Sequence, residues 1–331
     1  MSIKIRVALD AMGGDNAPSE IIKGAVTAAE NNDIEVVLVG QEAVIQEELD
    51  KCGSTDSRIS IALASEVING EESPVSAIQK KKDSSIVVGI NLLKYHEVSA
   101  FISAGSTGAV VTAALLTLGK RKGIRRPALG AIFPFPTGPL FFLDLGANAE
   151  CKPTSLVQFA NMGNDYMEMF FGITNPRIGL LSNGEENTKG NKLVQKAHKM
   201  LNKGKLNFIG NVEGRDITSG IADVIVTDGF TGNVIIKLGE SIGEMVLASL
   251  KHATTGSRKL KEAVAIFAPV LQAALSPLDY ADYGGALLLG VNGNVIIAHG
   301  RSHAKAIENA IITAKRAAEK EMTETEEVQE E

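Results

Sequence analysis

The stretch that decides the fold is residues 222–237, ADVIVTDGFTGNVIIK. It opens with the apolar run Val224-Ile225-Val226, which has the size of a buried parallel strand and stops at Thr227-Asp228-Gly229. Gly229 and Gly232 then allow a tight loop, and we expect Thr231 to cap a helix whose apolar residues recur at helical spacing. A strand, a glycine loop and a helix N-terminus in this order point free backbone N–H groups at an anion.

The composition is ordinary for a globular protein, with 44% hydrophobic and 22% charged residues in 331. No apolar run approaches the roughly 20 residues of a membrane span, and no signal peptide is expected, because a strand pattern follows Met1 directly. The two cysteines, Cys52 and Cys151, stand in no metal or redox spacing. The sequence therefore predicts a cytoplasmic protein without a metal site.

The net charge of −6 comes from the last thirteen residues, 319–331. Of the 33 basic and 39 acidic residues in the chain, this segment holds one and seven, so the rest is balanced. We expect an acidic, disordered tail, and no nucleic-acid partner.

Strand patterns alternate with helical patterns through most of the chain. Strands are expected at residues 3–9, 34–39, 59–63, 98–102, 128–133, 140–143, 178–181, 206–209, 224–226 and 294–298. Helices include one long helix over 74–95 and a last helix over 304–318. This pattern predicts a single three-layer α/β/α domain over residues 1–318 with a mainly parallel sheet, plus a helical hairpin at about 238–275.

Glycines and polar residues follow the strands, at the edge where parallel sheets bind ligands. One such loop can be a plain βα turn, but five together favour a shared site for a small anion. The phosphate or substrate contacts expected there are Asp10, Gly13, Gly14, Gly105, Ser106, Thr107, Gly108, Asn148, Glu185, Asn211, Glu213, Gly229, Thr231 and Gly232.

Several motifs are absent or unconvincing. The chain has no G-x-G dinucleotide fingerprint, no phosphate-binding P-loop motif and no zinc spacing. The segment 239–243, GESIG, matches the nucleophile elbow of a serine hydrolase, with aspartates and histidines following in triad order. An elbow needs a strand before its serine, whereas the pattern around Ser241 is helical. A hydrolase using Ser241 remains an alternative, and Cys151 is better explained as a small buried residue.

Seven motifs together resemble one family. VALDAMGGDNAP, ISAGSTGA, DLGANAECKP, GLLSNGEENTKGN, NFIGNVEGRD, VTDGFTGNV and DYGGALLLG occur in order between Ile5 and about Ala314. They are similar to those of the bacterial phosphate acyltransferases of phospholipid synthesis, the PlsX family. Ser106 stands where this family frequently has Asn, and Ser182-Asn183 replaces an Asn-aliphatic pair. Both changes keep polar groups, so they affect fine geometry rather than the reaction.

The resemblance implies an enzyme that converts acyl-[acyl carrier protein] and inorganic phosphate into acyl phosphate, without a cofactor. An acyl-phosphate:glycerol-3-phosphate acyltransferase then uses that product. It also implies a homodimer, a fold akin to phosphotransacetylase and isopropylmalate dehydrogenase, and peripheral association with the inner face of the cell membrane. A non-enzymatic scaffold that binds phosphorylated metabolites is the remaining alternative.

On this interpretation phosphate attacks the thioester directly, so the chain needs positioned charges rather than a nucleophile. The catalytic residues expected are Lys189, Asn233 and Asp228. Lys189 would neutralise phosphate or the oxyanion, while Asn233 and Asn211 would donate hydrogen bonds to it. The acids Asp10, Asp228 and Glu185 would orient Lys189 and the loops, or accept a phosphate proton.

Two surfaces are expected to meet partners. The basic cluster at 120–126, with Arg121 and Arg125, would dock the acidic carrier protein, unless it is only a solvated connection. The second hairpin helix places Leu260, Val264, Ile266 and Phe267 beside basic residues at its start. Such a helix suits an anionic membrane surface, and a dimer interface is an equal alternative.

Overall fold

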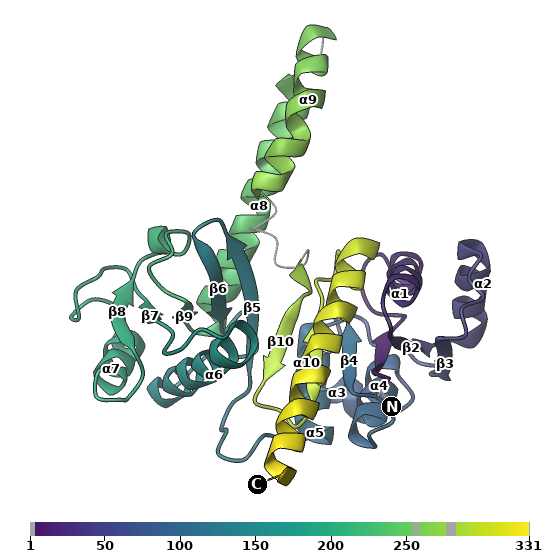
Figure 1. Cartoon of the computed structure of the whole chain (residues 1–331), viewed down its shortest axis with the longest axis horizontal. Coiled ribbons are helices and arrows are strands. Elements are labelled where there is room, and N and C mark those ends of the chain that lie inside the picture. Colours follow the sequence, from purple (N-terminus) through teal and green to yellow (C-terminus); the bar gives the residue numbers. More distant parts are fainter. Residues whose placement is uncertain (1–3, 254–257, 276–282, 331) are drawn as a thin grey trace. The chain divides into compact units, whose positions relative to one another are not determined.

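The structure is a computed structural model that describes residues 4–253, 258–275 and 283–330 (Figure 1). Its packing divides the chain into two compact units. The first unit comprises Met1–Gly130, Met169–Gly172 and Ala281–Glu331, and the second comprises Ala131–Glu168 and Ile173–Tyr280. Each unit combines β-strands with covering helices, and we describe the two separately.

Among the described residues, seven strands belong to the first unit wholly or in part. In spatial order they are β3 (Ile59–Leu63), β2 (Glu35–Gly40), β1 (Arg6–Asp10), β4 (Ala100–Ser103), β11 (Asn294–Ile297), β10 (Ala286–Leu289) and β5 (Ala128–Phe135). The strands from β3 to β11 pair in parallel, whereas β10 is antiparallel to both of its neighbours. The prediction of a mainly parallel sheet is therefore confirmed.

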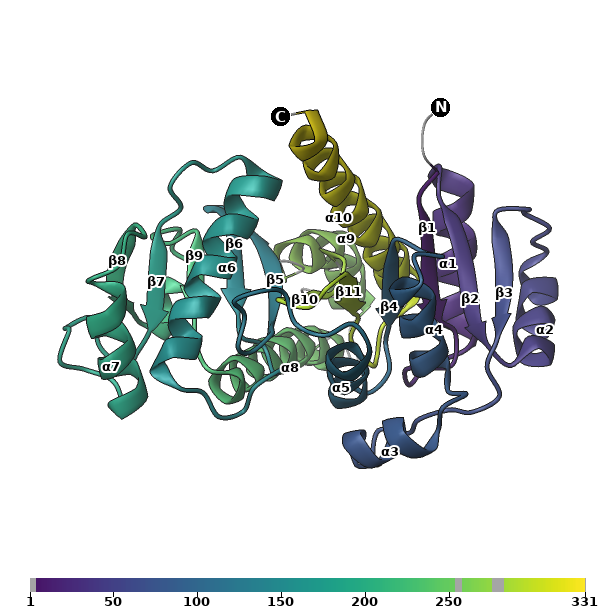
Figure 2. The same cartoon turned by 90° about the horizontal axis from the view of Figure 1, so that it is seen from below.

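Helices cover both faces of this sheet. One group consists of α1 (Ser19–Asn31), α2 (Glu42–Cys52) and α10 (Ala304–Glu330), and the other of α3 (Pro74–Lys80), α4 (Ser85–Lys94) and α5 (Thr107–Thr117). Both α10 and α4 pack on β1 and β4 from opposite sides (Figure 2). Parallel strands buried on both faces explain the continuous apolar runs of the sequence.

Helices α1 and α10 approach each other closely at Gly24. A β-carbon there would lie 2.6 Å from Ala304 O and 2.6 Å from Ile307 Cβ, so the contact needs glycine. Glu20 on α1 also accepts a hydrogen bond from Ala304 N at 3.0 Å, which caps α10. The last helix of the chain is thereby anchored to the first.

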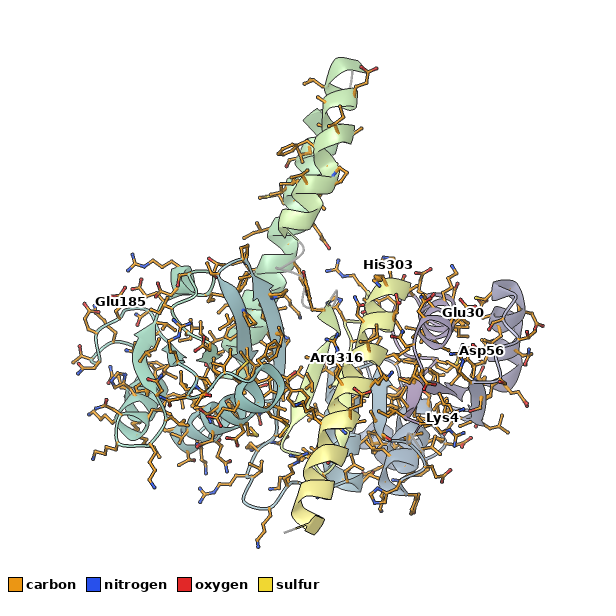
Figure 3. All side chains as sticks on the ribbon, in the orientation of Figure 1. Lys4, Glu30, Asp56, Glu185, His303 and Arg316 are labelled. Atoms are coloured by element: carbon orange, nitrogen blue, oxygen red, sulfur yellow. The ribbon has the colours of Figure 1, made fainter. Side chains whose placement is uncertain are left out.

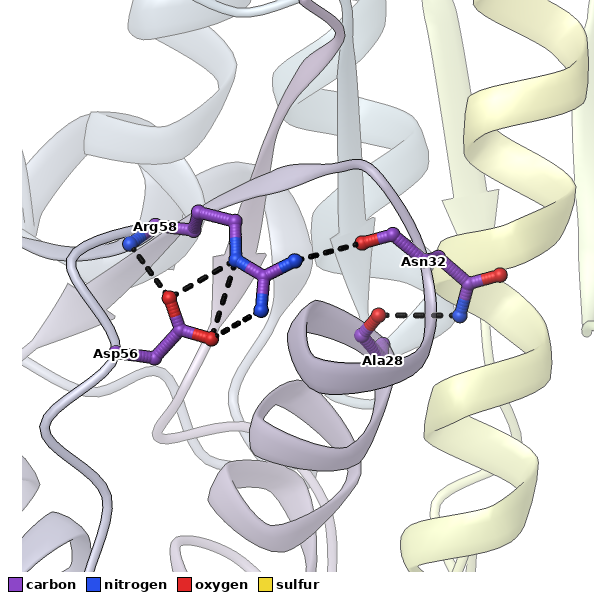
Figure 4. Close-up of polar contacts among 4 residues, drawn as sticks. All are labelled: Ala28, Asn32, Asp56 and Arg58. Atoms are coloured by element: carbon purple, nitrogen blue, oxygen red, sulfur yellow. Dashed lines mark hydrogen bonds and ion pairs between the residues drawn. The ribbon is translucent and has the colours of Figure 1, made fainter.

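The far end of α1 is tied to the turn before β3 (Figure 4). Arg58 Nη1 donates to Asn32 O at 3.3 Å, and Asp56 Oδ1 accepts from both Arg58 N and Arg58 Nε at 2.9 Å. Asn32 Nδ2 in turn donates to Ala28 O at 3.0 Å. The C-terminal carbonyls of α1 thus find side-chain partners.

In the part of the second unit that the structure describes, four parallel strands lie wholly within the unit, and β5 continues into it from the first unit. The four are β6 (Gly138–Leu143), β9 (Val224–Val226), β7 (Ile178–Leu181) and β8 (Phe208–Val212), in this spatial order. The helices are α6 (Pro153–Phe171), α7 (Lys192–Leu201), α8 (Gly229–Ala253) and α9 (Arg258–Leu275). In the core of this unit, the ring of Phe141 stacks on that of Tyr166 with centroids 4.2 Å apart.

Several sequence predictions hold, and several are corrected. The strand at 59–63 and the strand at 178–181 have the predicted bounds, and the hairpin is present as α8 and α9. Its expected connection at 254–257 lies outside the described residues. The single helix predicted over 74–95 is wrong, because the chain leaves helical geometry at Lys81, whose ammonium bonds Val67 O and Glu72.

The C-terminal segment also differs from its prediction. Helix α10 continues through Glu330 instead of ending near residue 318 in a disordered tail. Glutamate, lysine and methionine favour helix, and the segment holds neither glycine nor proline. Glu321 accepts a hydrogen bond from Asn294 Nδ2 at 2.7 Å, which holds the extension on the first unit. Nowhere in the described part of the chain is a helix both long and apolar enough to cross a membrane.

The close approach at Gly24 predicts a stability difference between two Gly→Ala variants. Alanine is favoured over glycine in helices by about 1 kcal/mol. At Gly24 the added methyl group meets α10, so Gly24→Ala should destabilise by about 1–3 kcal/mol despite that gain. Gly243→Ala on α8, where nothing lies within 4 Å, should be neutral or stabilising. Urea unfolding midpoints measure both; equal effects would contradict the packing described.

Candidate active site

In the second unit, the buried carboxylate of Asp144 organises the loop that follows β6. Its Oδ1 accepts hydrogen bonds from Gly146 N at 3.2 Å and Ala147 N at 3.0 Å. Its Oδ2 accepts from Asn148 N at 2.8 Å and from Asn148 Nδ2 at 2.9 Å. Charge-assisted bonds of this kind are about twice as strong as neutral ones. They hold residues 144–148 in one conformation.

The N-terminus of α8 packs directly on this loop. Gly229 N donates to Asn148 O at 2.9 Å. A β-carbon at Gly232 would lie 1.9 Å from Asp144 O, and one at Gly229 would lie 2.8 Å from Asp144 Oδ2. Both positions therefore require glycine, and backbone meets backbone without an intervening side chain. The glycine loop predicted from the sequence serves this contact.

Two polar residues fix the start of α8. Asp228 accepts a hydrogen bond from Thr231 N through Oδ1, and another from Thr231 Oγ1 through Oδ2, both at 2.9 Å. Asp228 is thus the N-cap of α8, because an aspartate just before a helix can accept a hydrogen bond from the third helical amide. The prediction that Thr231 caps the helix is therefore wrong by three residues. Asn233 Nδ2 donates to Leu145 O at 3.2 Å, which places this amide against the Asp144 loop.

Lys189 lies on the exposed loop between β7 and α7. Its backbone N–H donates to Glu186 O at 2.9 Å, and Gly190 N donates to Asn183 Oδ1 at 2.8 Å. The stem of Lys189 packs over Gly184, where a β-carbon would lie 2.7 Å from Lys189 Cγ. Among the residues that the structure describes, Lys189 forms no ion pair. Its ammonium is therefore available to an anion.

Glu185, Glu213 and Asn211, also predicted in this unit, bond Arg215 or a backbone carbonyl rather than the Lys189 side chain. Glu185, which is labelled in Figure 3, pairs with Arg215 at 2.9 Å, and Arg215 pairs also with Glu213 at 2.8 Å. Both glutamates raise the pKa of that arginine, with Glu213 the larger cause. Asn211 Nδ2 donates to Glu186 O at 2.8 Å. Asn211 thus holds the Lys189 loop with the amide that was expected to meet an oxyanion.

The first unit contains a second cluster built around Asp10 at the end of β1. Ser103 Oγ donates to Asp10 Oδ2 at 2.7 Å, and Met12 N donates to Oδ1 at 3.1 Å. Burial raises the pKa of the Asp10 carboxyl, and the hydrogen bonds from serines and backbone N–H groups oppose that rise. A β-carbon at Gly13 would lie 2.8 Å from Gly105 N, so the loops after β1 and β4 touch.

The two clusters share one construction. Residues 103–110, SAGSTGAV, and 227–234, TDGFTGNV, have the same spacing of glycines, threonine and valine. Each follows a strand that pairs in parallel with the strand that ends in the buried aspartate, β4 with β1 and β9 with β6. Each leads into a helix, α5 after Ser106 and α8 after Asp228. In the first unit, a β-carbon at Gly14 would lie 3.1 Å from Gly300 O, and one at Gly108 would lie 2.8 Å from Pro74 Cγ. A helix N-terminus favours an anion, although at α8 Gly229 N and Thr231 N already donate to Asn148 O and Asp228 Oδ1.

The sequence places Asp144 at the strand-end edge, but Asp144 was not among the phosphate or substrate contacts expected there. The signal was present, because Leu-Asp followed by a glycine-containing loop occurs at the end of both aspartate-bearing strands. Whether this pattern marks a site depends on which strand pairs with the aspartate-bearing strand, and the sequence alone does not give that pairing.

Some predicted residues lie elsewhere. Lys120 Nζ donates to Arg125 O at 3.1 Å, and Arg121 Nε donates to Val291 O at 3.2 Å, all in the first unit. Ser241 lies in the middle of α8 with no strand before it, so the hydrolase elbow does not form. The described residues contain no group of three or more histidine, cysteine and carboxylate side chains that could hold a metal ion.

The fold is that of known phosphotransacetylases. A phosphotransacetylase from Streptococcus pyogenes superposes with a TM-score of 0.62 at 18% identity, covering 96% of this chain and 95% of that one. The EutD phosphotransacetylase from Staphylococcus aureus gives 0.60 at 18% identity, covering 95% and 94%. At this level of identity the likeness establishes the architecture.

Sequence comparison reaches closer relatives. Residues 5–325 match the family described as "Fatty acid synthesis protein". A relative named phosphate acyltransferase from Heliobacterium modesticaldum is 51% identical over 312 residues, which are 94% of this chain and 93% of the relative. Another of the same name from Thermoanaerobacter pseudethanolicus is 50% identical with the same coverage.

The raised pKa of Asp10 predicts how stability depends on pH. The folded state holds this proton above the ordinary value of 3.8, so the contribution of Asp10 to stability is complete below 3.8 and is lost as pH rises through the raised pKa. Asp10→Asn removes the titration. The free energy of unfolding of the wild type should therefore fall relative to Asp10→Asn as pH rises from 3.8. Urea titrations in steps of pH measure the difference, and parallel curves would contradict it.

Proposed function

Because this chain belongs to the fatty acid synthesis protein family and is a phosphate acyltransferase, we propose that Lys189 and Asn233 carry its reaction. The family supports acyl-[acyl carrier protein] and inorganic phosphate as the substrates. The observation that supports this function most is the 51% identity with a phosphate acyltransferase over 94% of the chain.

The reaction needs no nucleophile from the protein. An oxygen of hydrogen phosphate attacks the thioester carbonyl, a tetrahedral oxyanion forms, and the C–S bond breaks to give acyl phosphate and the carrier thiolate. The proton that hydrogen phosphate loses balances the proton that the thiolate gains. What the protein supplies is position and positive potential. The ammonium of Lys189 suits the phosphate or the oxyanion, since this exposed loop lysine forms no ion pair among the described residues.

Asn233 suits the second role, that of a neutral hydrogen-bond donor. It lies one turn into α8, near the end of the helix at which the dipole favours negative charge. Asp228 contributes by capping this helix, because both of its carboxylate oxygens are already occupied by Thr231. The cluster around Asp10 in the first unit offers a similar helix N-terminus, at Thr107 and Gly108, to a phosphate group.

Carrier protein would dock on the basic segment of the first unit. Backbone acceptors hold Lys120 and Arg121, and Arg121 also pairs with Glu321 at 3.5 Å. A fixed cluster of this kind attracts an acidic carrier locally although the body of the chain is balanced in charge.

The hairpin of α8 and α9 would serve as both dimer and membrane surface. The first helix exposes a stripe at helical spacing that includes Val234, Leu238, Ile242 and Met245. We assign this stripe to a second copy of the chain.

On α9, Leu260, Ile266 and Phe267 are exposed while Val264 is half-buried, and the sequence places basic residues at the helix start. We assign this face to an anionic membrane on the cytoplasmic side, where acyl phosphate reaches the glycerol-3-phosphate acyltransferase.

The roles of Lys189 and Asn233 predict the activity of three variants. Lys189→Ala should lower turnover by about 100- to 1,000-fold, because it removes one preorganised electrostatic group, and Asn233→Ala should lower it less. Lys192→Ala, an exposed lysine at the start of α7, is the matched control and should retain activity. The assay follows release of carrier protein from its acyl thioester, with and without phosphate. Near-normal turnover of Lys189→Ala at saturating phosphate would refute its role, and release without phosphate would indicate a hydrolase instead.

The assignment of α9 predicts a loss of membrane binding. Ile266 and Phe267 are 80% and 58% exposed, so Ile266→Gln with Phe267→Gln removes apolar surface at small cost to the fold. Sedimentation with phosphatidylglycerol vesicles should drop, while dimerisation and turnover of a soluble substrate persist. Leu116→Gln, at a residue 64% exposed on α5 in the first unit, is the control and should sediment like the wild type. A double variant that is monomeric, or that still sediments, would overturn the assignment.

A further inference from the structure

The loop that carries Lys189 is held mainly through its backbone. On one side, Gln195 Nε2 on α7 donates to Thr188 O at 2.8 Å and to Gly190 O at 3.0 Å. Asn183, and the residues from Glu185 to Lys189, are exposed to solvent. An exposed lysine side chain can adopt many rotamers, so its mean position depends on where the backbone is held. The position of the Lys189 ammonium therefore depends on the contacts that hold the backbone at Glu186 and Lys189.

The carbonyl oxygen of Glu186 accepts two of the hydrogen bonds that hold this backbone. It accepts a hydrogen bond from Lys189 N at 2.9 Å, which closes the turn from Glu186 to Lys189. It accepts a second bond from Asn211 Nδ2 at 2.8 Å, which ties that turn to strand β8. Both lone pairs of this carbonyl are thereby used. The turn is anchored to the sheet by one side-chain amide.

The orientation of that amide is set by a buried histidine. Asn211 Oδ1 lies 2.9 Å from His198 Nδ1, and both side chains are buried. Since Asn211 Nδ2 donates to a carbonyl, Oδ1 must be the atom that faces the imidazole, and it can only accept. His198 Nδ1 therefore carries the proton. A flipped amide would set two oxygens against each other at Glu186 and two donors against each other at His198.

His198 is itself held by its surroundings. It projects from α7, and its ring meets that of Phe208 on β8 edge to face, with centroids 5.1 Å apart at 75°. The histidine thus has a fixed place between the helix and the strand that flank the Lys189 loop. His198 has no direct role in the proposed reaction.

We propose that His198 and Asn211 are positioning residues for Lys189. His198 Nδ1–H orients Asn211, Asn211 Nδ2–H holds Glu186 O, and that carbonyl fixes the amide of Lys189. The inference rests on the proposed role of Lys189 in acyl transfer to phosphate. Neither positioning residue contacts the reacting atoms, so each acts only through the lysine.

The test is a double-mutant cycle between His198 and Lys189. His198→Phe keeps the ring packing on Phe208 and removes the donor, so kcat/KM for phosphate should fall by about 10- to 100-fold, the effect of a small misplacement. His198→Asn restores a donor near the position of Nδ1 and should recover most of the activity. In the Lys189→Ala background, His198→Phe should change kcat/KM no further, because coupled residues are not additive.

Two more variants distinguish the positioning of Lys189 from a general loss of fold stability. Leu201→Ala removes a buried side chain from the same helix without touching the network, and should lower the melting temperature while leaving the KM for phosphate unchanged. Asn211→Asp keeps the shape and the acceptor for His198 but loses the donor to Glu186, and should reproduce the loss seen with His198→Phe.

The outcomes separate this inference from the proposed function. If Lys189→Ala is nearly as active as the wild type, the catalytic role of Lys189 fails, and the positioning role fails with it. If Lys189→Ala is inactive but His198→Phe is normal, or lowers kcat/KM equally in both backgrounds, the positioning role alone fails. Failure of His198→Asn to recover activity, when it is folded, would also overturn it.

Discussion

The second unit depends on a charge that is taken out of water and bonded to the backbone. Burying a carboxylate is costly unless donors surround it, and Asp144 has four N–H donors within 3.2 Å. Those bonds fix the loop that follows β6. Once that loop is fixed, the start of α8 can only lie where Gly229 and Gly232 let the two backbones touch. Asn233, in the next position of the helix, then bonds Leu145 O.

The first unit repeats this arrangement with different chemistry around the carboxylate. Asp10 receives two backbone amides and serine hydroxyl groups, and burial outweighs them in raising its pKa. Ser103 links the aspartate to the neighbouring loop, since its hydroxyl donates to Asp10 and accepts from Gly105 N at 3.0 Å. In both units a buried aspartate at a strand end fixes a loop, and a glycine of the neighbouring loop packs against it. The similar spacing of 103–110 and 227–234 follows from this shared demand.

The sequence predicted the helices and strands that have long or regular apolar patterns. It did not predict features that depend on which distant residues come into contact. Strands of buried aliphatic residues and the helices α8 and α9 were found, because their periodicity is local. Strand β10 was missed, since four apolar residues after Gly284 and Gly285 have no periodicity to distinguish them. The strand-end residues were predicted as a group, but their partners were not. Nothing in the local sequence says that Glu185 meets Arg215, or that Asn211 meets His198.

The hydrogen-bond partners also resolve an electrostatic difficulty in the predicted site. Aspartates at strand ends should repel a phosphate dianion, yet this chain has one at the end of β1, β6 and β9. Backbone amides and hydroxyl groups of their own loops occupy the oxygens of Asp10, Asp144 and Asp228. Each carboxyl group is thus turned inward, where it stiffens a loop. Lys189 has no such partner among the described residues, so its positive charge stays outward. The acids therefore build the site, and the lysine supplies the charge that an incoming phosphate meets.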